Sequence, residues 1–490
     1  MLKNWVDSAM LCDTFRMLSG EEKYIMRDTT VSAVSTPYGR GGIAVIRISG
    51  NEAISVADKM FRSRNGKKLS DISGGRVIYG DILYGSDIID DGLASVFRAP
   101  NSFTGEDTVE ISCHGGILIT SKVLESTFLC GAEPAGPGEF TMRSFMSGHI
   151  GLSQAEAVMD MIDAKSSGQL AVASAQSRGV LSGKVGEIYG RLAELVAGIY
   201  VDIDYPGEDL SSYDTEKIIA QTSDIASDIK KLADTYKTGH AVSEGIPVVI
   251  AGKPNTGKSS LMNMLLCRDR AIVTSEAGTT RDVIEETLEA GAVLLRLFDT
   301  AGIRDAGSEA ERLGIERTLG KMSEAELVLA VFDISSDPDD EDKRFISELE
   351  KYKAAGGNIL VILNKSDLCT DGRTGGIKEL LSDRFGSAEI ISAANGEGRS
   401  NILSRIESLY LDGSIDLKND AVVSNSRQYA ALNNSISHLS DAVNALIGGM
   451  TEDIAGTDME LALSALGQLD GRSVTEDIVH GIFSRFCVGK

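Results

Sequence analysis

The sequence is poor in cysteine, proline and aromatic residues and has no long apolar run. Its six cysteines include no C-x-x-C pair and no nearby histidine at metal-ligand spacing, which argues against a disulfide framework and a zinc site. No stretch reaches the roughly 18 uninterrupted apolar residues of a membrane-spanning helix. The low proline count and a hydrophobic fraction of 42% exclude collagenous and disordered classes. We expect a cytoplasmic globular protein with reduced thiols, no export signal and no membrane association.

Positive charge is also scarce. The 48 Lys and Arg residues face 72 Asp and Glu residues, which gives a net charge of −24 at pH 7. The field of the whole molecule therefore repels polyanions, so a nucleic-acid partner has to be held locally. The length of 490 residues exceeds what one hydrophobic core usually serves and predicts about three domains.

Three kinds of sequence follow one another along the chain. Residues 29–148 alternate short β-rich runs with Gly and Pro and predict an α+β domain. Residues 152–239 are helical in pattern, with apolar residues on one face at Ile188, Leu192, Leu195, Val196 and Ile199. From residue 246, apolar strands alternate with helical stretches, which predicts a mostly parallel sheet covered by helices. Helices return after residue 411, and Ser473-Val474-Thr475-Glu476 predicts a capping box at the last one.

The helical stretch at the end is thin for a core of its own. We infer that both helical stretches form one domain, into which the α/β unit is inserted at a surface loop. The predicted fold class is therefore multidomain, α+β and α/β. The expected boundaries are an N-terminal extension at 1–27, an α+β domain at 28–150, a helical domain at 151–244 and 412–490, and an inserted domain at 245–411.

A phosphate-binding loop is predicted at residues 252–259, with the sequence Gly-Lys-Pro-Asn-Thr-Gly-Lys-Ser. It follows a predicted buried strand and opens a predicted helix, so backbone N–H groups and the positive helix end converge on a nucleotide's β- and γ-phosphates. Lys258 adds a point charge, and the Ser259 hydroxyl can bind Mg²⁺ bridging those phosphates. A Gly-rich turn without a ligand is the structural alternative.

Two further motifs also end predicted strands. Asp299-Thr300-Ala301-Gly302 can hold the metal's water shell and reach the γ-phosphate. Asn364-Lys365-Ser366-Asp367 is interpreted as the base-reading loop, because the Asp367 carboxylate can accept both N1–H and N2–H of guanine. Adenine would leave buried polar groups unpaired there, so GTP is favoured over ATP.

The region between the first helix and the second strand of this unit has the pattern of a switch segment. It contains Gly278-Thr279-Thr280-Arg281-Asp282, with Thr280 as the second hydroxyl on Mg²⁺. Ile303 stands where Ras-like GTPases place the glutamine that orients water, so another group has to supply that role. Glu309, Glu311 and Glu316 follow, although each taken singly reads as a solvated helix charge.

Several motifs give the chain a family resemblance from about residue 28 to 490. They are Gly39-Arg40-Gly41-Gly42 with Ile46-Arg47-Ile48-Ser49-Gly50, Phe103-Thr104-Gly105-Glu106-Asp107, Cys113-His114-Gly115-Gly116, Pro137-Gly138-Glu139-Phe140-Thr141, Gln154-Ala155-Glu156-Ala157 and Phe486-Cys487-Val488-Gly489-Lys490. With the inserted GTPase unit, the chain resembles the MnmE (TrmE) family of tRNA-modification GTPases.

The resemblance implies an N-terminal folate-binding and dimerisation domain, a discontinuous helical domain and an inserted Ras-like G domain. It implies a homodimer that joins an FAD-dependent partner, MnmG (GidA), in a heterotetramer. Together they would add a (carboxymethyl)aminomethyl group to C5 of the wobble uridine of certain tRNAs. The one-carbon donor would be 5-formyltetrahydrofolate or a related tetrahydrofolate.

The resemblance also implies that GTP hydrolysis is switched on when two G domains meet across K⁺. Asn255, Thr274, Glu276 and Thr279 match the K⁺ ligands, and Glu311 matches the catalytic glutamate. The cation would supply the positive charge that an arginine finger provides elsewhere. The implied GTP-binding residues are Asn255, Thr256, Gly257, Lys258, Ser259, Ser260, Thr274, Ser275, Glu276, Ala277, Gly278, Thr279, Thr280, Asp299, Thr300, Ala301, Gly302, Asn364, Lys365, Ser366, Asp367, Ser392, Ala393 and Ala394.

For folate, the resemblance points to Arg47, Glu110, His149 and Lys490. The family usually carries Lys or Arg at the position of His149, and a neutral imidazole weakens that contact. Read without the resemblance, Arg47 and Glu110 are more typical of a structural ion pair.

Two rival functions remain from the sequence. One is a ribosome-assembly or RNA-binding GTPase timer without modification chemistry, against which the net charge argues. The other is a GTP-gated structural dimer that binds folate without chemistry.

Overall fold

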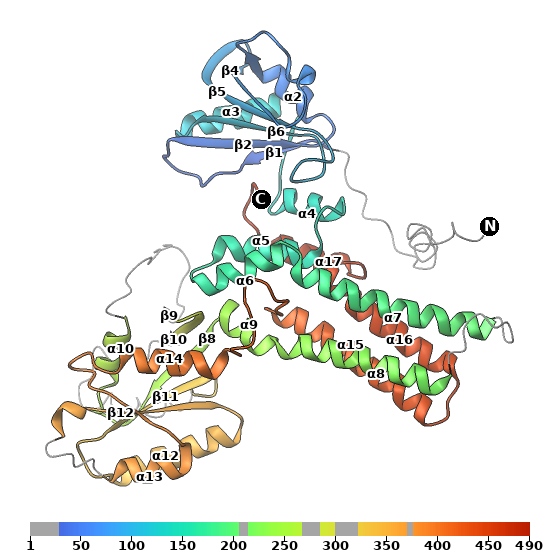
Figure 1. The fold of residues 1–490 in the computed structure, drawn as a ribbon. Coiled ribbons are helices and arrows are strands. Elements are labelled where there is room, and N and C mark those ends of the chain that lie inside the picture. Colours follow the sequence, from blue (N-terminus) through green and yellow to red (C-terminus); the bar gives the residue numbers. More distant parts are fainter. Residues whose placement is uncertain (1–28, 205–213, 267–284, 299–321, 370–375) are drawn as a thin grey trace. The chain divides into compact units, whose positions relative to one another are not determined.

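The computed structural model describes residues 29–204, 214–266, 285–298, 322–369 and 376–490 (Figure 1). The chain divides into two compact units. The first combines the residues up to Gly151 with Val474–Lys490, and the second is Leu152–Ser473. The predicted domain boundaries placed 412–490 together, whereas the structure groups Val474–Lys490 with the N-terminal part. None of the helices that are described is both long enough and apolar enough to cross a membrane.

The first unit is built on a seven-stranded sheet. Its strand order is β3-β4-β5-β6-β2-β1-β7, with all neighbours antiparallel except β1 and β7. The strands are β1 (Val31–Val34), β2 (Ile43–Ser49), β3 (Phe61–Ser63), β4 (Arg76–Tyr84), β5 (Asp87–Phe97), β6 (Thr108–His114) and β7 (Glu133–Pro134). Alternate residues such as Ile46, Ile48 and Ile111 are fully buried, as the two-residue period of a strand requires.

Helices cover one face of this sheet. They are α2 (Ala53–Met60) and α3 (Ile117–Leu129), whose buried residues share the core of the sheet. The unit also contains the 3₁₀ turn η1 (Leu69–Asp71) and the helices α4 (Glu139–Met146) and α17 (Glu476–Phe483). The predicted capping box before α17 is wrong. Thr475 is the N-cap and makes no side-chain cap bond, while the Ser473 hydroxyl donates to the Ser464 carbonyl 2.5 Å away. The reason is that α17 begins at Glu476 with Thr475 as its N-cap, so Ser473 lies two residues before the position from which a hydroxyl accepts the N3 N–H.

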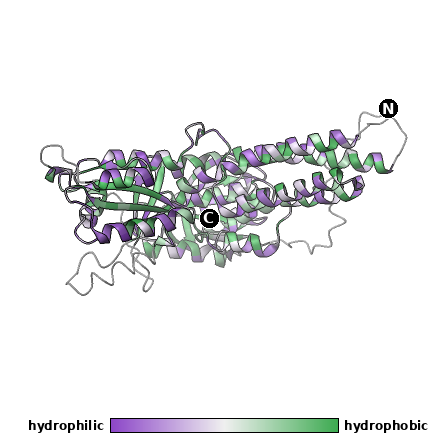
Figure 2. Cartoon of the chain, turned by 90° about the horizontal axis from the view of Figure 1, so that it is seen from below, coloured by the Kyte–Doolittle hydropathy of each residue, from purple (hydrophilic) through white to green (hydrophobic). Residues whose placement is uncertain are grey.

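The helical part of the second unit joins two segments that lie far apart in sequence. Its helices are α5 (Leu152–Asp163), α6 (Ser167–Ser177), α7 (Val180–Asp204), α8 (Thr215–Asp234), α9 (Tyr236–Ser243), α15 (Ser426–Ile447) and α16 (Glu452–Asp470). Residues of α7, α8, α15 and α16 share one apolar core, and the predicted face of α7 is buried in it. Figure 2 shows hydrophilic and hydrophobic residues alternating along such helices. The α/β segment is thus inserted between two halves of one bundle.

The inserted segment folds around a six-stranded sheet of order β13-β12-β11-β8-β10-β9, in which β9 alone is antiparallel to its neighbour. The strands are β8 (Ile246–Ala251), β9 (Glu285–Ala290), β10 (Val293–Phe298), β11 (Leu327–Asp333), β12 (Asn358–Asn364) and β13 (Glu389–Ile390). The helices are α10 (Lys258–Leu266), α12 (Asp340–Ala354), η2 (Ser366–Leu368), α13 (Ile377–Phe385) and α14 (Arg399–Tyr410). The predicted parallel sheet is confirmed, and the carboxyl ends of its parallel strands β8, β11 and β12 lie at one edge, where ligands bind in such sheets.

Candidate functional site

The loop between β8 and α10 has the backbone that a phosphate site needs. Asn255 and Gly257 adopt positive φ angles of 63° and 94°, and α10 begins at Lys258. The Lys258 ammonium donates to the carbonyls of Gly252 (2.9 Å) and Lys253 (2.7 Å), so it lies across the loop. Ser259 and Asn255 are exposed, whereas the buried Thr256 hydroxyl donates to the Lys253 carbonyl. Backbone N–H groups and a helix N-terminus therefore converge beside one lysine.

Lys253 ties this loop to α12. Its ammonium donates to Asp339 at 2.9 Å and to Asp342 at 2.6 Å, and both carboxylates also form the capping box of α12. Lys253 holds the pKa of Asp339 at about 2. The loop is thus braced by an acidic helix N-terminus, a contact that the sequence patterns did not reveal.

Asn364 joins the base-reading loop to the phosphate loop. Its amide nitrogen donates to the Thr256 carbonyl and its amide oxygen accepts from Ala393 N–H, each at 2.9 Å. The side chain is buried, and a Cβ on Gly257 would collide with its amide nitrogen. Glycine is required at 257 both for this close approach and for the positive φ. One amide therefore fixes three predicted GTP-binding segments relative to one another.

The remaining groups of the base-reading loop are also held in place. The Lys365 ammonium donates to Asp333 at 2.6 Å. Burial by itself raises the pKa of Asp333, but hydrogen bonds from Lys365 and Ser335 outweigh burial, and the pKa is lowered. The Ser392 hydroxyl donates to Asp367 Oδ1 at 2.5 Å. The structure thereby brings the predicted motifs 364–367 and 392–394 together at the carboxyl end of β12.

Other predicted nucleotide and metal residues lie outside the described residues. They are Thr274, Ser275, Glu276, Ala277, Gly278, Thr279, Thr280, Asp299, Thr300, Ala301, Gly302 and Glu311. Of the predicted metal ligands, only Asn255 and Ser259 are described. Both stand at the phosphate loop, on its left-handed residue and on the first turn of α10.

In the first unit, Arg47 and Glu110 are cross-strand partners on β2 and β6. Glu110 Oε1 accepts from Arg47 Nε (2.9 Å) and from a terminal guanidinium nitrogen (2.8 Å), while Glu110 Oε2 makes no hydrogen bond with a described residue. The Arg47 guanidinium also lies 5.1 Å from the Phe103 ring centroid and 5.4 Å from that of Phe140. The pair is a structural ion pair that leaves one carboxylate oxygen able to accept a ligand N–H.

The segment Val474–Lys490 reaches the same neighbourhood. Phe140 N–H donates to the Lys490 carbonyl at 3.1 Å, and the Ser35 hydroxyl donates to the Gly489 carbonyl at 2.9 Å. Gly489 has a φ of 99°, and a Cβ there would collide with the Val34 carbonyl oxygen. Through Phe140, three of the four predicted folate residues are brought together: Arg47, Glu110 and Lys490.

His149 is not hydrogen-bonded to this group of described residues. Its backbone N–H donates to the Ser144 carbonyl, and its exposed side chain makes no hydrogen bond or ion pair with a described residue. The structure therefore gives no contact between His149 and the other predicted folate residues within the described part of the chain.

Arg143 organises the surroundings of the predicted folate residues. Its buried guanidinium binds Glu139 (2.8 Å), Glu106 (3.1 Å) and the Thr29 carbonyl (2.8 Å). Glu139 in turn accepts from Gly136 N–H, which shapes the turn next to Lys490. The motifs at 103–107 and 137–141 were noted in the sequence, but their joint dependence on Arg143 has no signal in residue spacing.

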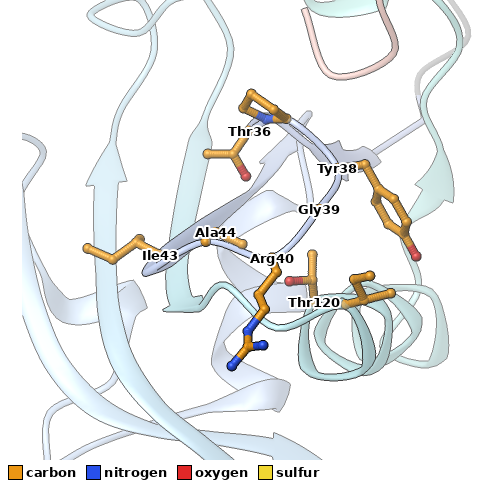
Figure 3. Close-up of a pocket in the computed structure, with 10 residues that line it drawn as sticks. Thr36, Tyr38, Gly39, Arg40, Ile43, Ala44 and Thr120 are labelled. Carbon is orange, nitrogen blue, oxygen red and sulfur yellow. The ribbon is translucent and has the colours of Figure 1, made fainter. Parts of the chain in front are cut away.

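A pocket of about 280 Å³ lies beside the glycine-rich loop at residues 39–42 (Figure 3). Its lining includes Tyr38, Arg40, Ile43 and the buried Thr120. It does not include Arg47, Glu110, His149 or Lys490. The pocket is therefore separate from the predicted folate residues.

Comparison with known proteins covers nearly the whole chain. Residues 152–487 match the family "MnmE helical domain", and residues 30–149 match "GTP-binding protein TrmE N-terminus". The "tRNA modification GTPase MnmE" of Clostridioides difficile (strain 630) is 40% identical over 463 residues, covering 94% of this chain and 99% of that protein. The "tRNA modification GTPase MnmE" of Symbiobacterium thermophilum is 40% identical over 468 residues, covering 95% and 100%.

Among solved structures, a crystal structure of Aquifex aeolicus Era bound to GDP.AlF4- has a TM-score of 0.27 and 23% identity. It covers 39% of this chain and 66% of that one. The family models and the two relatives, by contrast, match nearly the full length of the chain. The chain belongs to the MnmE family of tRNA modification GTPases.

Proposed function

We propose that this chain hydrolyses GTP as a step in the modification of tRNA. The observation that supports this most directly is the Asn364 amide, which holds a phosphate loop and an Asp367 base-reading loop in one arrangement. Membership of the MnmE family is the reason to propose tRNA as the molecule that is modified.

The selectivity for guanine is testable at Asp367. A carboxylate accepts N1–H and N2–H of guanine, whereas an Asn side chain there would accept N1–H and donate to the C2 carbonyl of xanthine. Asp367→Asn is therefore expected to weaken GTP binding and to improve XTP binding. Asp383→Asn, on α13, is the matched control. Unchanged preference in the Asp367 variant would contradict the assignment of the base-reading loop.

The finer proposal for hydrolysis is a Mg²⁺ held by Ser259 and Thr280, and a K⁺ held by Asn255, Thr274, Glu276 and Thr279 as two G domains meet. Glu311 is proposed to position the attacking water. The exposed Asn255 on the left-handed turn of the loop is compatible with a ligand at the rim of the site. Bound Mg²⁺ and K⁺ would neutralise the charge that develops on the phosphates.

The cation proposal is tested by GTP turnover in KCl and NaCl at matched ionic strength. We expect faster turnover in KCl, and Asn255→Ala should abolish that difference while leaving GTP binding within a few-fold. Equal rates of GTP turnover in KCl and NaCl for the parent protein would contradict activation by K⁺.

We further propose that the first unit binds a tetrahydrofolate such as 5-formyltetrahydrofolate. Glu110 Oε2 can accept a pterin N–H, Arg47 and the rings of Phe103 and Phe140 lie beside it, and the Lys490 carbonyl accepts from the Phe140 N–H. The folate would supply the one-carbon unit, and these residues would bind and orient it. Glu110→Gln keeps the shape but places a donor beside Arg47, so 5-formyltetrahydrofolate should bind at least tenfold more weakly. Binding equal to that of the parent would contradict the site.

The complete reaction is proposed to need a homodimer and the FAD-dependent partner MnmG in a cytoplasmic heterotetramer. The product would be a (carboxymethyl)aminomethyl group at C5 of the wobble uridine. Incubation with the partner, GTP, folate donor and unmodified tRNA tests this directly. A wobble uridine that stays unmodified under all these conditions would favour a GTPase timer instead.

A further inference from the structure

One segment of the first unit is positively charged, although the chain as a whole is negatively charged. Residues 59–76 carry six basic residues and one acidic residue, a net charge of +5 in a chain whose total is −24. The basic residues are Lys59, Arg62, Arg64, Lys67, Lys68 and Arg76. They run from the end of α2 through the edge strand β3 to the start of β4, so the segment that carries them includes one edge of the sheet.

The backbone of this segment is fixed at several points. The Asn65 side chain accepts from Lys67 N–H at 3.0 Å and from the Ser63 hydroxyl at 2.6 Å, which forms a tight turn. Leu69 is buried in the core, and its N–H donates to the Asp58 carboxylate at 2.5 Å. Basic side chains on an ordered backbone lose less conformational entropy on binding than those on a free loop.

Arg98 holds the same loop from the other side. Its guanidinium donates to the carbonyls of Ser70 (2.8 Å) and Ile72 (3.4 Å). The acid Asp58 is occupied by the backbone N–H groups of Leu69 and Ser70. Hydrogen bonds therefore fix the backbone of the loop between β3 and β4, which carries Lys67 and Lys68.

Protection of a sheet edge explains part of this charge, since proteins place Lys and Arg on edge strands to block pairing with other chains. Arg62 and Arg64 fit that role, because they lie beside β4 and share Asp81 at 3.8 Å and 3.0 Å. Lys67, Lys68 and Arg76 do not. All three are exposed, and none forms an ion pair with a carboxylate of a described residue. Their charge is left for a partner.

An exposed aromatic ring lies beside Arg64, one of the basic residues, and its hydroxyl donates to Asp91. Tyr79 on β4 is 47% exposed, and the Arg64 guanidinium lies 5.0 Å from its ring centroid. Nucleic-acid sites combine lysines and arginines that neutralise phosphates with aromatic and guanidinium planes on which bases stack. An acidic protein partner would match the charge but would not need the ring.

We propose that Lys67, Lys68 and Arg76, together with Arg62, Arg64 and Tyr79 of the same β3–β4 segment, form the surface on which this chain binds the phosphate backbone of tRNA. The proposal rests on the proposed function and names its RNA contact. At physiological salt, charges more than about 8 Å away are largely screened, so a local basic edge attracts RNA although the whole molecule is acidic. The acidic remainder would limit the contact to this edge.

The experiment uses the full chain and a fluorescent, unmodified tRNA transcript, with fluorescence anisotropy measured from 50 to 200 mM KCl. The test variant is Lys67→Ala/Lys68→Ala/Arg76→Ala. The control is Lys343→Ala/Lys351→Ala/Lys378→Ala, which removes three exposed charges from the G domain helices α12 and α13. Both variants change the net charge equally.

The test variant should bind tRNA at least tenfold more weakly at 100 mM KCl. The slope of log affinity against log salt should become shallower by about 2 to 3, since each lost phosphate contact contributes about 0.7 to 0.9. The control should stay within about twofold of the parent. Tyr79→Leu, which removes the ring, should weaken binding about fivefold or more without changing the slope.

Equal losses in test and control variants, or no loss in the test variant, would overturn the proposal. A change in the oligomeric state of the test variant with unchanged tRNA binding would overturn it too and assign the edge to contact between copies. GTP turnover and wobble-uridine modification by the parent, measured in parallel, separate these failures from failure of the proposed function.

Discussion

Asn364→Ala is expected to loosen the nucleotide site at its centre. The substitution removes two hydrogen bonds of 2.9 Å and leaves the Thr256 carbonyl and the Ala393 N–H without partners in a buried place. An unsatisfied buried group costs about 1–3 kcal/mol, so the two together should destabilise the G domain by about 2–6 kcal/mol. Because the same amide positions the phosphate loop, GTP binding should fall at least tenfold, which corresponds to about 1.4 kcal/mol.

Two measurements check this prediction. Equilibrium titration with a fluorescent GTP analogue gives the affinity, and hydrogen exchange of the β8 and β12 amides gives the local free energy of opening, because a multidomain chain does not unfold in one transition. The control is Asn358→Ala, at the start of the same strand, where a partly buried amide donates to the Tyr410 hydroxyl at 3.3 Å. The reasoning is refuted if Asn364→Ala binds GTP within twofold of the parent and lowers the local free energy of opening by less than about 1 kcal/mol.

Three further predictions concern other parts of the chain. Arg143→Ala leaves Glu106 and Glu139 without their buried partner and should lower the stability of the first unit by about 3–5 kcal/mol. Hydrogen exchange in β2 and β6 should then be faster. Exchange as slow as in Lys184→Ala, which removes one member of an exposed ion pair, would contradict this prediction. Gly489→Ala places a Cβ against the Val34 carbonyl at a φ of 99° and should expose residues 484–490 to proteolysis, whereas Gly481→Ala, with open space around it, should not. Glu244 and then Glu326 raise the pKa of His240 to about 9, above its ordinary 6.5. Its contribution to stability is therefore complete below about pH 6.5 and lost as the pH rises through 9, and His240→Gln should flatten that part of a stability-against-pH profile.

Much of the nucleotide site could be predicted from the sequence because its motifs are local. Two motifs carried the prediction, the Gly-rich loop and the Asn364-Lys365-Ser366-Asp367 turn. Each follows an apolar strand and can be recognised from eight consecutive residues or fewer. The parallel sheet followed from the alternation of apolar strands and helices, and the buried face of α7 from its period.

The rest depends on contacts that spacing does not encode. The Lys253 contact with Asp339 and Asp342 spans more than eighty residues, and the Arg143 bond to the Thr29 carbonyl spans 114. Helix α17 has Thr475 and not Ser473 as its N-cap, and the Ser473 hydroxyl donates to the Ser464 carbonyl, a contact that residue spacing does not predict. The resemblance named Arg47, Glu110 and Lys490 together, but Phe140 as the residue between them came from the structure.

The bond from Ser35 to Gly489 has a consequence for how the protein is made. The two residues are 454 positions apart, so β1 leaves the ribosome long before its neighbour in the folded state has been translated. While the bundle and the GTPase are synthesised, the nascent N-terminal unit lacks the contacts that Ser35, Gly138 and Phe140 make with residues 487–490. Arg47 and Glu110 can pair early, since both belong to the N-terminal sheet, but Lys490 joins them only as translation finishes. The proposed folate site would therefore be completed only after the GTPase has been synthesised.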